Sequence, residues 1–139
     1  MNCCVSGVKK PRVSRAVLDS SALLALLFQE PGGQKVAGHL PDSLLSAVNL
    51  SEVVTKTVDT GMTLEEARLV VAGLPCEIVP FDGEQAFLAA ALRGATRSLG
   101  LSLGDRACLA LGLKTGHPVV TADRLWDQCD VGVQVIRIR

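Results

Sequence analysis

From Arg15 onward, short apolar runs alternate with longer segments in which apolar residues recur at helical spacing. The short runs are predicted to be strands and cover residues 16–18, 43–47, 76–81, 118–121 and 133–138. The longer segments are predicted to be helices and cover residues 21–28, 49–60, 63–72, 84–99 and 103–114, with a short helical turn over 124–128. Strands separated by helices favour an α/β fold whose mainly parallel sheet is covered on both faces. The last strand alternates apolar and polar residues, which indicates a sheet edge.

The pattern indicates a single domain over residues 15–139. Residues 1–14 carry no periodic pattern and are predicted to be a loose N-terminal tail. A chain of 139 residues with 48% hydrophobic residues is long enough to bury a substantial core. Aromatic residues make up only 3% and tyrosine is absent, so the core must consist of leucine, valine, alanine and isoleucine.

Charge and cysteine content narrow the class of protein. Fourteen basic residues balance fourteen acidic ones, so contact with RNA would need a local patch or a bound metal. The five cysteines are odd in number and show no C-x-x-C spacing, which indicates neither a disulfide framework nor a zinc site. The longest apolar run, Ala22–Phe28, is too short to cross a bilayer. We therefore expect a soluble, cytoplasmic protein.

Four acidic residues are predicted to converge at one edge of the sheet. Asp19 ends the first strand and Asp123 follows the fourth, at the carboxyl ends where parallel sheets bind ligands. Glu52 lies in the first turn of the helix that leaves the second strand. Asp105 opens the helix before the fourth strand. It joins the other acids only if the helix over 84–99 crosses the sheet obliquely, which is an assumption at this point.

Each acid also has a purely structural interpretation. Asn49 with Glu52, and Ser102 with Asp105, fit a capping box in which the acid accepts free backbone N–H groups. The first and last acids could be simple N-caps. Four unrelated caps need not point into one crevice, however, so the joint pattern favours a common site.

Such a cluster suits metal chemistry. Mg²⁺ and Mn²⁺ prefer carboxylate and water oxygens. Without a cation, four close carboxylates repel one another, and their pKa values rise. A metal-bound water could then attack a phosphodiester without a histidine base. His39 and His117 are accordingly expected at the surface.

Four segments of the chain carry a family resemblance, namely VLDSSALLALL, SAVNLSEVV, GLSLGDRACLALG and PVVTADRLW. In this order and spacing they resemble the PIN-domain toxins of the VapC type, from bacterial type II toxin–antitoxin pairs, over about residues 16–139. The resemblance implies a three-layer α/β/α fold and a Mg²⁺- or Mn²⁺-dependent endoribonuclease that cleaves single-stranded or looped RNA. By match to the motifs, the catalytic and metal-binding residues would be Asp19, Glu52, Asp105 and Asp123. It also implies a cognate antitoxin and a homodimer.

Further residues have supporting roles in this interpretation. Thr121 would orient the last acid or a metal-bound water, and Asn49 could support the second acid or only cap its helix. Arg106 and Arg124 each adjoin a site acid and could bind RNA phosphates or be ordinary solvated charges. Asp127, one turn beyond the last acid, could join the acidic pocket.

Other functions remain open from the sequence. A housekeeping RNA-processing PIN nuclease would use the same residues. A phosphoacceptor signalling domain would also place acids at the sheet edge, but it needs a lysine after a late strand, and Lys114 precedes the fourth strand. A binding module that kept the fold without the chemistry is a third alternative, and the complete set of four acids argues against it.

Overall fold

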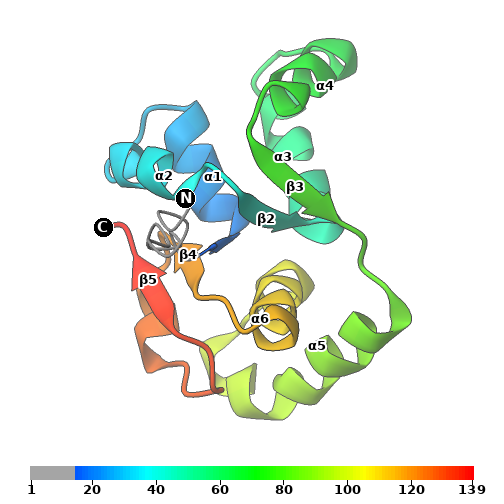
Figure 1. Cartoon of the computed structure of the whole chain (residues 1–139), viewed down its shortest axis with the longest axis vertical. Helices are drawn as coiled ribbons and strands as arrows, with labels where there is room; N and C mark the ends of the chain where they lie inside the picture. Colours follow the sequence, from blue (N-terminus) through cyan, green and yellow to red (C-terminus); the bar gives the residue numbers. More distant parts are fainter. Residues whose placement is uncertain (1–14) are drawn as a thin grey trace, which may run out of the picture.

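The fold is built around one five-stranded sheet. The structure, a computed structural model, describes residues 15–139 (Figure 1), and the predicted tail over 1–14 lies outside them. The strands are β1 (Val17–Leu18), β2 (Ser43–Ser46), β3 (Cys76–Val79), β4 (Val119–Thr121) and β5 (Val135–Arg137). Their order is β3-β2-β1-β4-β5, and every neighbouring pair is parallel. The predicted α/β fold is confirmed, and β5 lies at an edge.

Helices connect the strands in the described part of the chain. The α-helices are α1 (Ser20–Leu27), α2 (Gly33–His39), α3 (Ala47–Asp59), α4 (Leu64–Ala72), α5 (Gly83–Thr96) and α6 (Leu103–Thr115), and the 3-10 helices are η2 (Arg97–Leu99) and η3 (Arg124–Gln128). The helix predicted over 84–99 is divided into α5 and η2. Its last turn tightens to 3-10 geometry and ends at Gly100, which has a left-handed φ of 66°.

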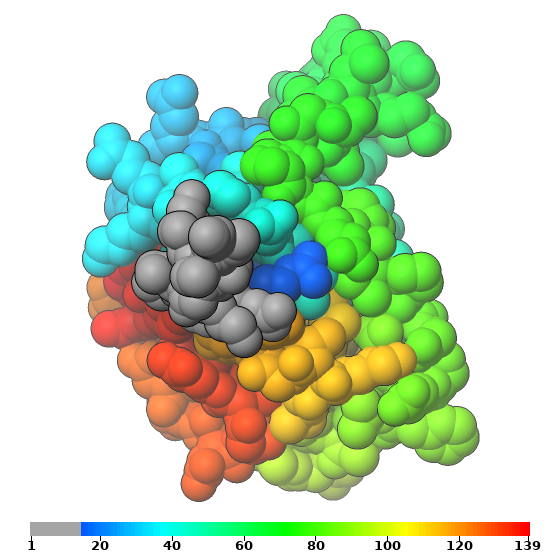
Figure 2. Space-filling view, in the orientation of Figure 1, coloured from blue at the N-terminus to red at the C-terminus, as the bar shows by residue number. Residues whose placement is uncertain are grey.

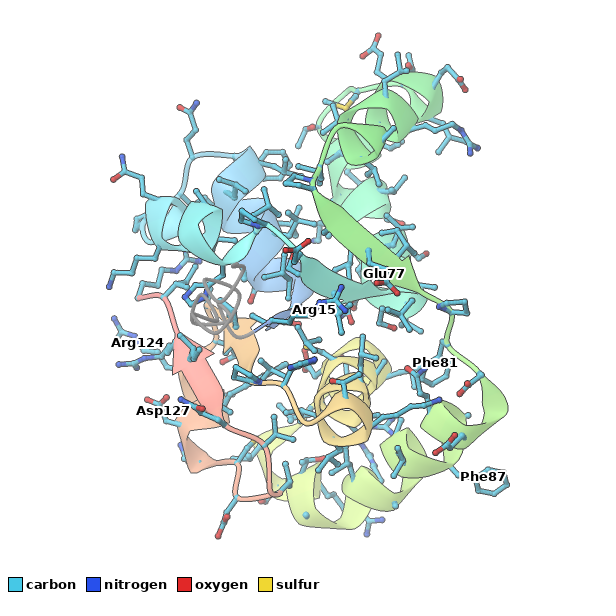
Figure 3. All side chains as sticks on the ribbon, viewed as in Figure 1. Arg15, Glu77, Phe81, Phe87, Arg124 and Asp127 are labelled. Atoms are coloured by element: carbon cyan, nitrogen blue, oxygen red, sulfur yellow. The ribbon has the colours of Figure 1, made fainter. Side chains whose placement is uncertain are left out.

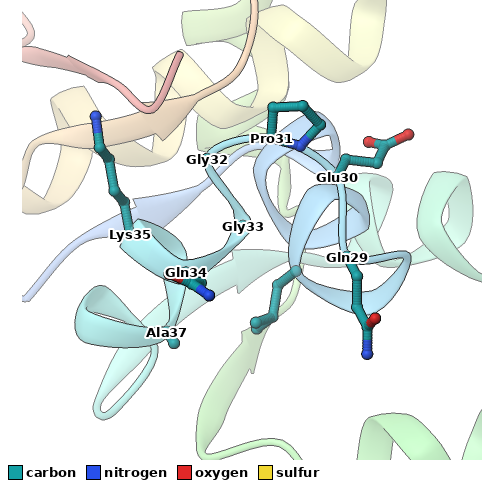
Figure 4. Close-up of a pocket in the computed structure, with 9 residues that line it drawn as sticks. Gln29, Glu30, Pro31, Gly32, Gly33, Gln34, Lys35 and Ala37 are labelled. Carbon is teal, nitrogen blue, oxygen red and sulfur yellow. The ribbon is translucent and has the colours of Figure 1, made fainter.

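Helix α2 was not predicted. A glycine pair between α1 and α2 begins α2 (Figure 4). Gly32 takes a φ of 87°, and Gly33 lies against the carbonyl oxygen of Ala25. Among the seven residues of α2, Val36 is the large apolar side chain, and it is fully buried. A single buried residue gives no helical periodicity, so the pattern could not reveal this helix.

Two groups of helices cover the two faces of the sheet. Successive strand residues point to opposite faces. Leu18 and Val120 join a core with residues of α1, α2 and α3, whereas Val17 and Val119 join a second core with residues of α5, α6 and η3. Trp126 is fully buried in the second core, where it serves as a packing residue. The three-layer α/β/α arrangement is therefore confirmed (Figure 1).

Helices α5 and α6 run antiparallel, and this brings the start of α6 to the carboxyl edge of the sheet. Near the end of α6, Lys114 pairs with Asp82 at 3.1 Å and with Glu84 at 3.2 Å, both at the start of α5. Near the start of α6, Arg106 donates from Nη1 to the carbonyl oxygen of Ala89 in α5 at 2.9 Å. Helix α5 packs mainly on α6. The return of the chain to the carboxyl edge, for which an oblique crossing of the sheet was assumed, is made by a helix that lies along α6.

Helices α3 and α4 form a hairpin that projects from the body (Figures 1 and 2). Helix α4 packs chiefly on α3 and buries only Ala67 completely. Leu64 and Leu69 on α4 are 59% and 69% exposed. In residues 15–139, no helix combines the length and apolarity needed to cross a membrane.

Two glycines of α2 test how closely α1 and α2 pack. We expect Gly33→Ala to lower the free energy of unfolding by about 1–3 kcal/mol, because its methyl group would overlap the carbonyl oxygen of Ala25. Gly38→Ala, in the same helix, meets no atom within 4 Å and should raise the free energy of unfolding by about 0.5–1 kcal/mol. Urea denaturation of both variants measures the difference, and shifts in the same direction would contradict this packing.

Candidate active site

The four predicted acids lie at the carboxyl edge of the sheet. Asp19 follows β1 directly and is only 3% exposed. Asp123 lies just beyond β4, and Glu52 lies in α3, which begins directly after β2. Asp105 lies in the first turn of α6. Because all the strands are parallel, these segments from distant parts of the chain meet at one edge.

The carboxylates are close enough to affect one another's ionisation. Burial raises the pKa of Asp19 to about 6, and the negative charges of Asp105 and Glu52 add to the rise. The pKa of Asp105 is also raised, first by burial and then by the charges of Glu52 and Asp123. The edge of the sheet therefore concentrates negative charge that no basic side chain neutralises within the described residues.

Asp19 is fixed by hydroxyl groups from two segments. Its Oδ2 accepts hydrogen bonds from Ser21 Oγ at 2.6 Å and from Thr121 Oγ1 at 2.9 Å. Thr121 Oγ1 also accepts the backbone N–H of Asp123 at 3.1 Å. Thr121 thus links the first acid to the backbone of the last. Asp19 occupies the N-cap position of α1, but its side chain accepts no capping hydrogen bond from this helix.

Glu52 is fixed by Ser20 and Asn49. Its Oε1 accepts from Ser20 Oγ at 2.5 Å and from Asn49 Nδ2 at 3.1 Å. Asn49 Nδ2 also lies 3.1 Å from the carbonyl oxygen of Gly104, so it bridges α3 and α6. The capping interpretation of Asn49 was wrong, because α3 begins earlier, with Ser46 as its N-cap. Ser20 was missed, although it directly follows the first acid in the sequence.

Gly104 brings the second acid against the start of α6. A methyl group at this position would overlap the Glu52 carboxylate. Gly104 is buried and directly precedes Asp105, so the absence of a side chain lets two acids from different helices approach each other. This glycine was not predicted to belong to the site. A glycine in the first turn of a helix that already has Ser102 as its N-cap was the available signal.

The other two acids also serve as helix caps. Asp105 forms the predicted capping box, in which its Oδ2 accepts the Ser102 N–H at 2.9 Å. Asp123 Oδ1 accepts the Leu125 N–H at 2.9 Å and caps η3. In each of these hydrogen bonds one carboxylate oxygen accepts. Capping and cation binding are therefore compatible.

The remaining candidates separate into different environments. Arg106 donates one hydrogen bond to α5, and this bond gives it a structural role between two helices. Arg124 is exposed beside Asp123 (Figure 3). Asp127 pairs with Arg137 of β5 at 3.1 Å, so the structure directs it to the sheet edge strand and not to the acidic pocket.

The donor set fits a hard, hydrated cation. Carboxylate oxygens are the ligands that Mg²⁺ and Mn²⁺ prefer. Burial raises the pKa of Asp19 to about 6 although two hydroxyl groups donate to its carboxylate. Among residues 15–139, no three histidine, cysteine, aspartate or glutamate side chains form a ready-made ligand cage. Mg²⁺ usually keeps several waters and takes one or two carboxylates directly, so such a cage is not required.

These carboxylates are distinct from the hollow near the α1–α2 turn. That hollow has a volume of about 940 Å³, and its lining includes Gln29, Glu30 and Lys35 (Figure 4). None of the four acids lines it.

We expect Asp19→Asn to stabilise the metal-free protein at pH 7.5. The carboxyl group of Asp19 has an ordinary pKa of 3.8 and a folded-state pKa of about 6, so the folded chain binds its proton more tightly. Stability is therefore lost as the pH rises from about 4 through 6, by up to about 3 kcal/mol. Asparagine remains neutral and can still accept both hydroxyl hydrogen bonds.

Thermal denaturation in EDTA measures this effect. The gain of Asp19→Asn should shrink below pH 4, where the wild-type carboxyl group is protonated. Asp127→Asn, which removes an exposed acid with its own arginine partner, is the control and should give no gain. A destabilised Asp19→Asn protein at pH 7.5 would show that the Asp19 charge is compensated.

Comparison with known proteins agrees with this fold. The family model described as PIN domain matches residues 16–131. A toxin–antitoxin complex from Klebsiella pneumoniae matches with 19% identity and a TM-score of 0.67, over 85% of this chain and 94% of that chain. DNA-bound VapBC from Salmonella typhimurium matches with 16% identity and a TM-score of 0.69, over 91% and 100%. VapBC-5 from Mycobacterium tuberculosis matches with 26% identity and a TM-score of 0.61, over 90% and 99%.

A search of curated protein sequences gives no match. The family model nevertheless spans most of the chain, including all four acids at the carboxyl edge. The chain belongs to the PIN domain family.

Proposed function

We propose that this protein is a metal-dependent endoribonuclease that acts as the toxin of a toxin–antitoxin pair. PIN domains are nucleases in general, and the chain belongs to this family. The observation that carries the proposal is the uncompensated cluster of carboxylates around the buried Asp19. Such a cluster costs folding stability, and divalent-metal phosphodiester chemistry supplies a reason to keep it.

The chain's own residues would position the cation and the RNA. Asp19, Glu52, Asp105 and Asp123 would hold Mg²⁺ or Mn²⁺. When bound, the cation would activate a water molecule and neutralise charge that develops on the phosphate. The hydroxyl and amide groups around the first two acids keep these carboxylates oriented before the cation arrives.

Individual side chains near the site, and not the overall charge of the protein, would bind the RNA substrate. The chain has no net charge, so the whole molecule does not attract polyanions. Arg124 is exposed next to Asp123, and we propose that it contacts a phosphate of single-stranded or looped RNA. Arg106 is engaged with α5 and is not part of this proposal.

The toxin role rests on the structural neighbours and on one apolar surface. The neighbours include chains of toxin–antitoxin complexes. A pocket of about 330 Å³ between α3 and α4 has an apolar lining that includes Leu50, Val54, Leu64 and Val71. We propose that a segment of a cognate antitoxin covers this pocket. A housekeeping nuclease would share the chemistry, and a neighbouring gene for a small DNA-binding protein distinguishes the two roles.

The phosphoacceptor alternative finds no support at the site. The lysine that it requires should face the acids from a late strand. Lys114 instead pairs with Asp82 and Glu84 near the end of α6, whereas Asp105 lies at its start.

Removing a single acid should abolish RNA cleavage. We expect Asp19→Asn and Asp105→Asn each to lower the cleavage rate of a fluorescent single-stranded RNA by at least about 100-fold in Mg²⁺ or Mn²⁺. EDTA should have the same effect on the wild-type protein. Asp127→Asn is the matched control and should keep full activity, because its carboxylate pairs with Arg137. Full activity in Asp19→Asn and Asp105→Asn would refute the proposed site.

Gly104 tests the approach of Glu52 to α6. In Gly104→Ala the flexible Glu52 side chain must move away, so the fold should survive with a change in stability of about 1 kcal/mol or less. RNA cleavage should nevertheless fall by about 10–100-fold, and more Mg²⁺ should be needed for half-maximal activity. Gly38→Ala, which meets open space, is the control. Unchanged metal dependence in Gly104→Ala would argue against a role for Glu52.

A further inference from the structure

The end of helix α5 carries two exposed arginines, here called the α5 arginine pair. Arg93 lies in the last turn of the helix and Arg97 directly follows it. They are four residues apart, so they lie on the same side of the helix, about 6 Å apart along its axis. Neither arginine forms an ion pair within residues 15–139. No other charged residue occurs from Gln85 to Gly104, so the end of α5 is a local surface of positive charge.

The α5 arginine pair lies near the acid at the start of α6. Because α5 and α6 are antiparallel, the end of α5 lies alongside the start of α6. Five residues after Arg97 comes Ser102, the N-cap of α6, which exchanges hydrogen bonds with Asp105. Five residues reach at most about 18 Å when fully extended, and the left-handed turn at Gly100 shortens this distance. The pair thus extends the surface beside the carboxylates.

The carboxylates do not attract RNA by themselves. Four carboxylates repel phosphate groups, and one divalent cation balances two of the four charges. The chain has no net charge to offset this repulsion. Aromatic side chains for base stacking are also scarce, because tyrosine is absent and the single tryptophan, Trp126, is fully buried. Binding of a single strand therefore depends on cationic side chains near the acids that contact its phosphates.

We propose that Arg93 and Arg97 bind phosphates of the RNA strand outside the cleaved bond, so that the RNA-binding surface extends from the acids along the end of α5. This inference rests on the proposed nuclease function and adds the residues that hold its substrate. The planar fork of N–H donors on each guanidinium suits phosphate oxygens. The spacing of the two arginines along the helix is similar to that of neighbouring phosphates in an extended single strand, so each arginine can bind one phosphate.

The same arginines also stabilise α5, because cations near the C-terminus of a helix interact favourably with the helix dipole. Two kinds of variant separate this role from RNA binding. Glutamine has nearly the helix propensity of arginine, so Arg93→Gln with Arg97→Gln removes the charge and keeps the helix. Arg93→Lys with Arg97→Lys keeps the charge and is the matched conservative variant. Both double variants should unfold close to the wild-type temperature, because the substituted side chains are exposed.

Fluorescence anisotropy with a labelled single-stranded RNA in Mg²⁺ tests the proposal on the full chain. All proteins carry Asp19→Asn, which should leave the RNA intact during the measurement. The double glutamine variant should raise the Kd by about fourfold or more. It should also lower the slope of log Kd against log salt concentration by about 1.4, since each phosphate contact of a single strand contributes about 0.7. The double lysine variant should keep the slope. Lys35→Gln with Arg68→Gln removes the same charge from α2 and α4 and should change neither quantity.

Steady-state cleavage by proteins that keep all four acids gives a second readout. The double glutamine variant should raise KM and leave kcat within about twofold of the wild-type value, because the arginines contact the RNA away from the reacting phosphate. A purely structural role of the arginines in α5 would change neither KM nor the salt dependence of binding.

The outcomes separate this inference from the proposed function. If the wild-type protein cleaves RNA and the double glutamine variant keeps its KM and its salt slope, this inference is wrong and the proposed function stands. A double lysine variant that loses the salt slope as fully as the glutamine variant would also overturn it. A wild-type protein that neither binds nor cleaves the RNA would overturn both proposals.

Discussion

The buried carboxylate of Asp19 is the constraint around which the rest of the site is arranged. It lies at the end of β1, the central strand of the sheet, where it is almost completely removed from water. Two hydroxyl groups donate to it, and three further acids face the same edge. Burying a charge in this way costs stability unless a cation or a proton compensates it. The buried charge at this site therefore lowers the free energy of unfolding of the metal-free protein.

The surrounding structure limits this penalty by giving each acid a defined place. Asp105 and Asp123 stabilise the starts of α6 and η3, so their charges also serve the helices. Glu52 is held by side chains from α1 and α3 and packs on a glycine of α6. One network of short hydrogen bonds thus ties together three helices and the end of β1. The acids are oriented before any ligand binds, which lowers the cost of binding.

Helix α6 separates the different surfaces of the molecule. Its first turn carries Asp105. Arg106 near its start donates a hydrogen bond to α5, and Lys114 near its end forms an ion pair with Asp82 at the start of α5. Helix α5 in turn buries Ala89 and Leu92 and exposes Phe87. The α3–α4 hairpin projects in another direction (Figure 1). Chemistry and the proposed antitoxin contact can therefore be altered separately.

Much of this arrangement follows from the sequence alone. Period-2 and period-3.6 patterns located the five strands and most helices, and the acids at strand ends had to meet at one edge because parallel strands share an edge. Helix α2 was not predicted because it buries only one large apolar residue. The antiparallel packing of α5 on α6 was not predicted because the hydrophobic pattern does not encode the direction in which a helix packs. Ser20 and Gly104 acquire their roles only when α1, α3 and α6 come together. Local propensity determines elements, whereas contacts between distant segments depend on the three-dimensional packing, and there the tertiary structure decides.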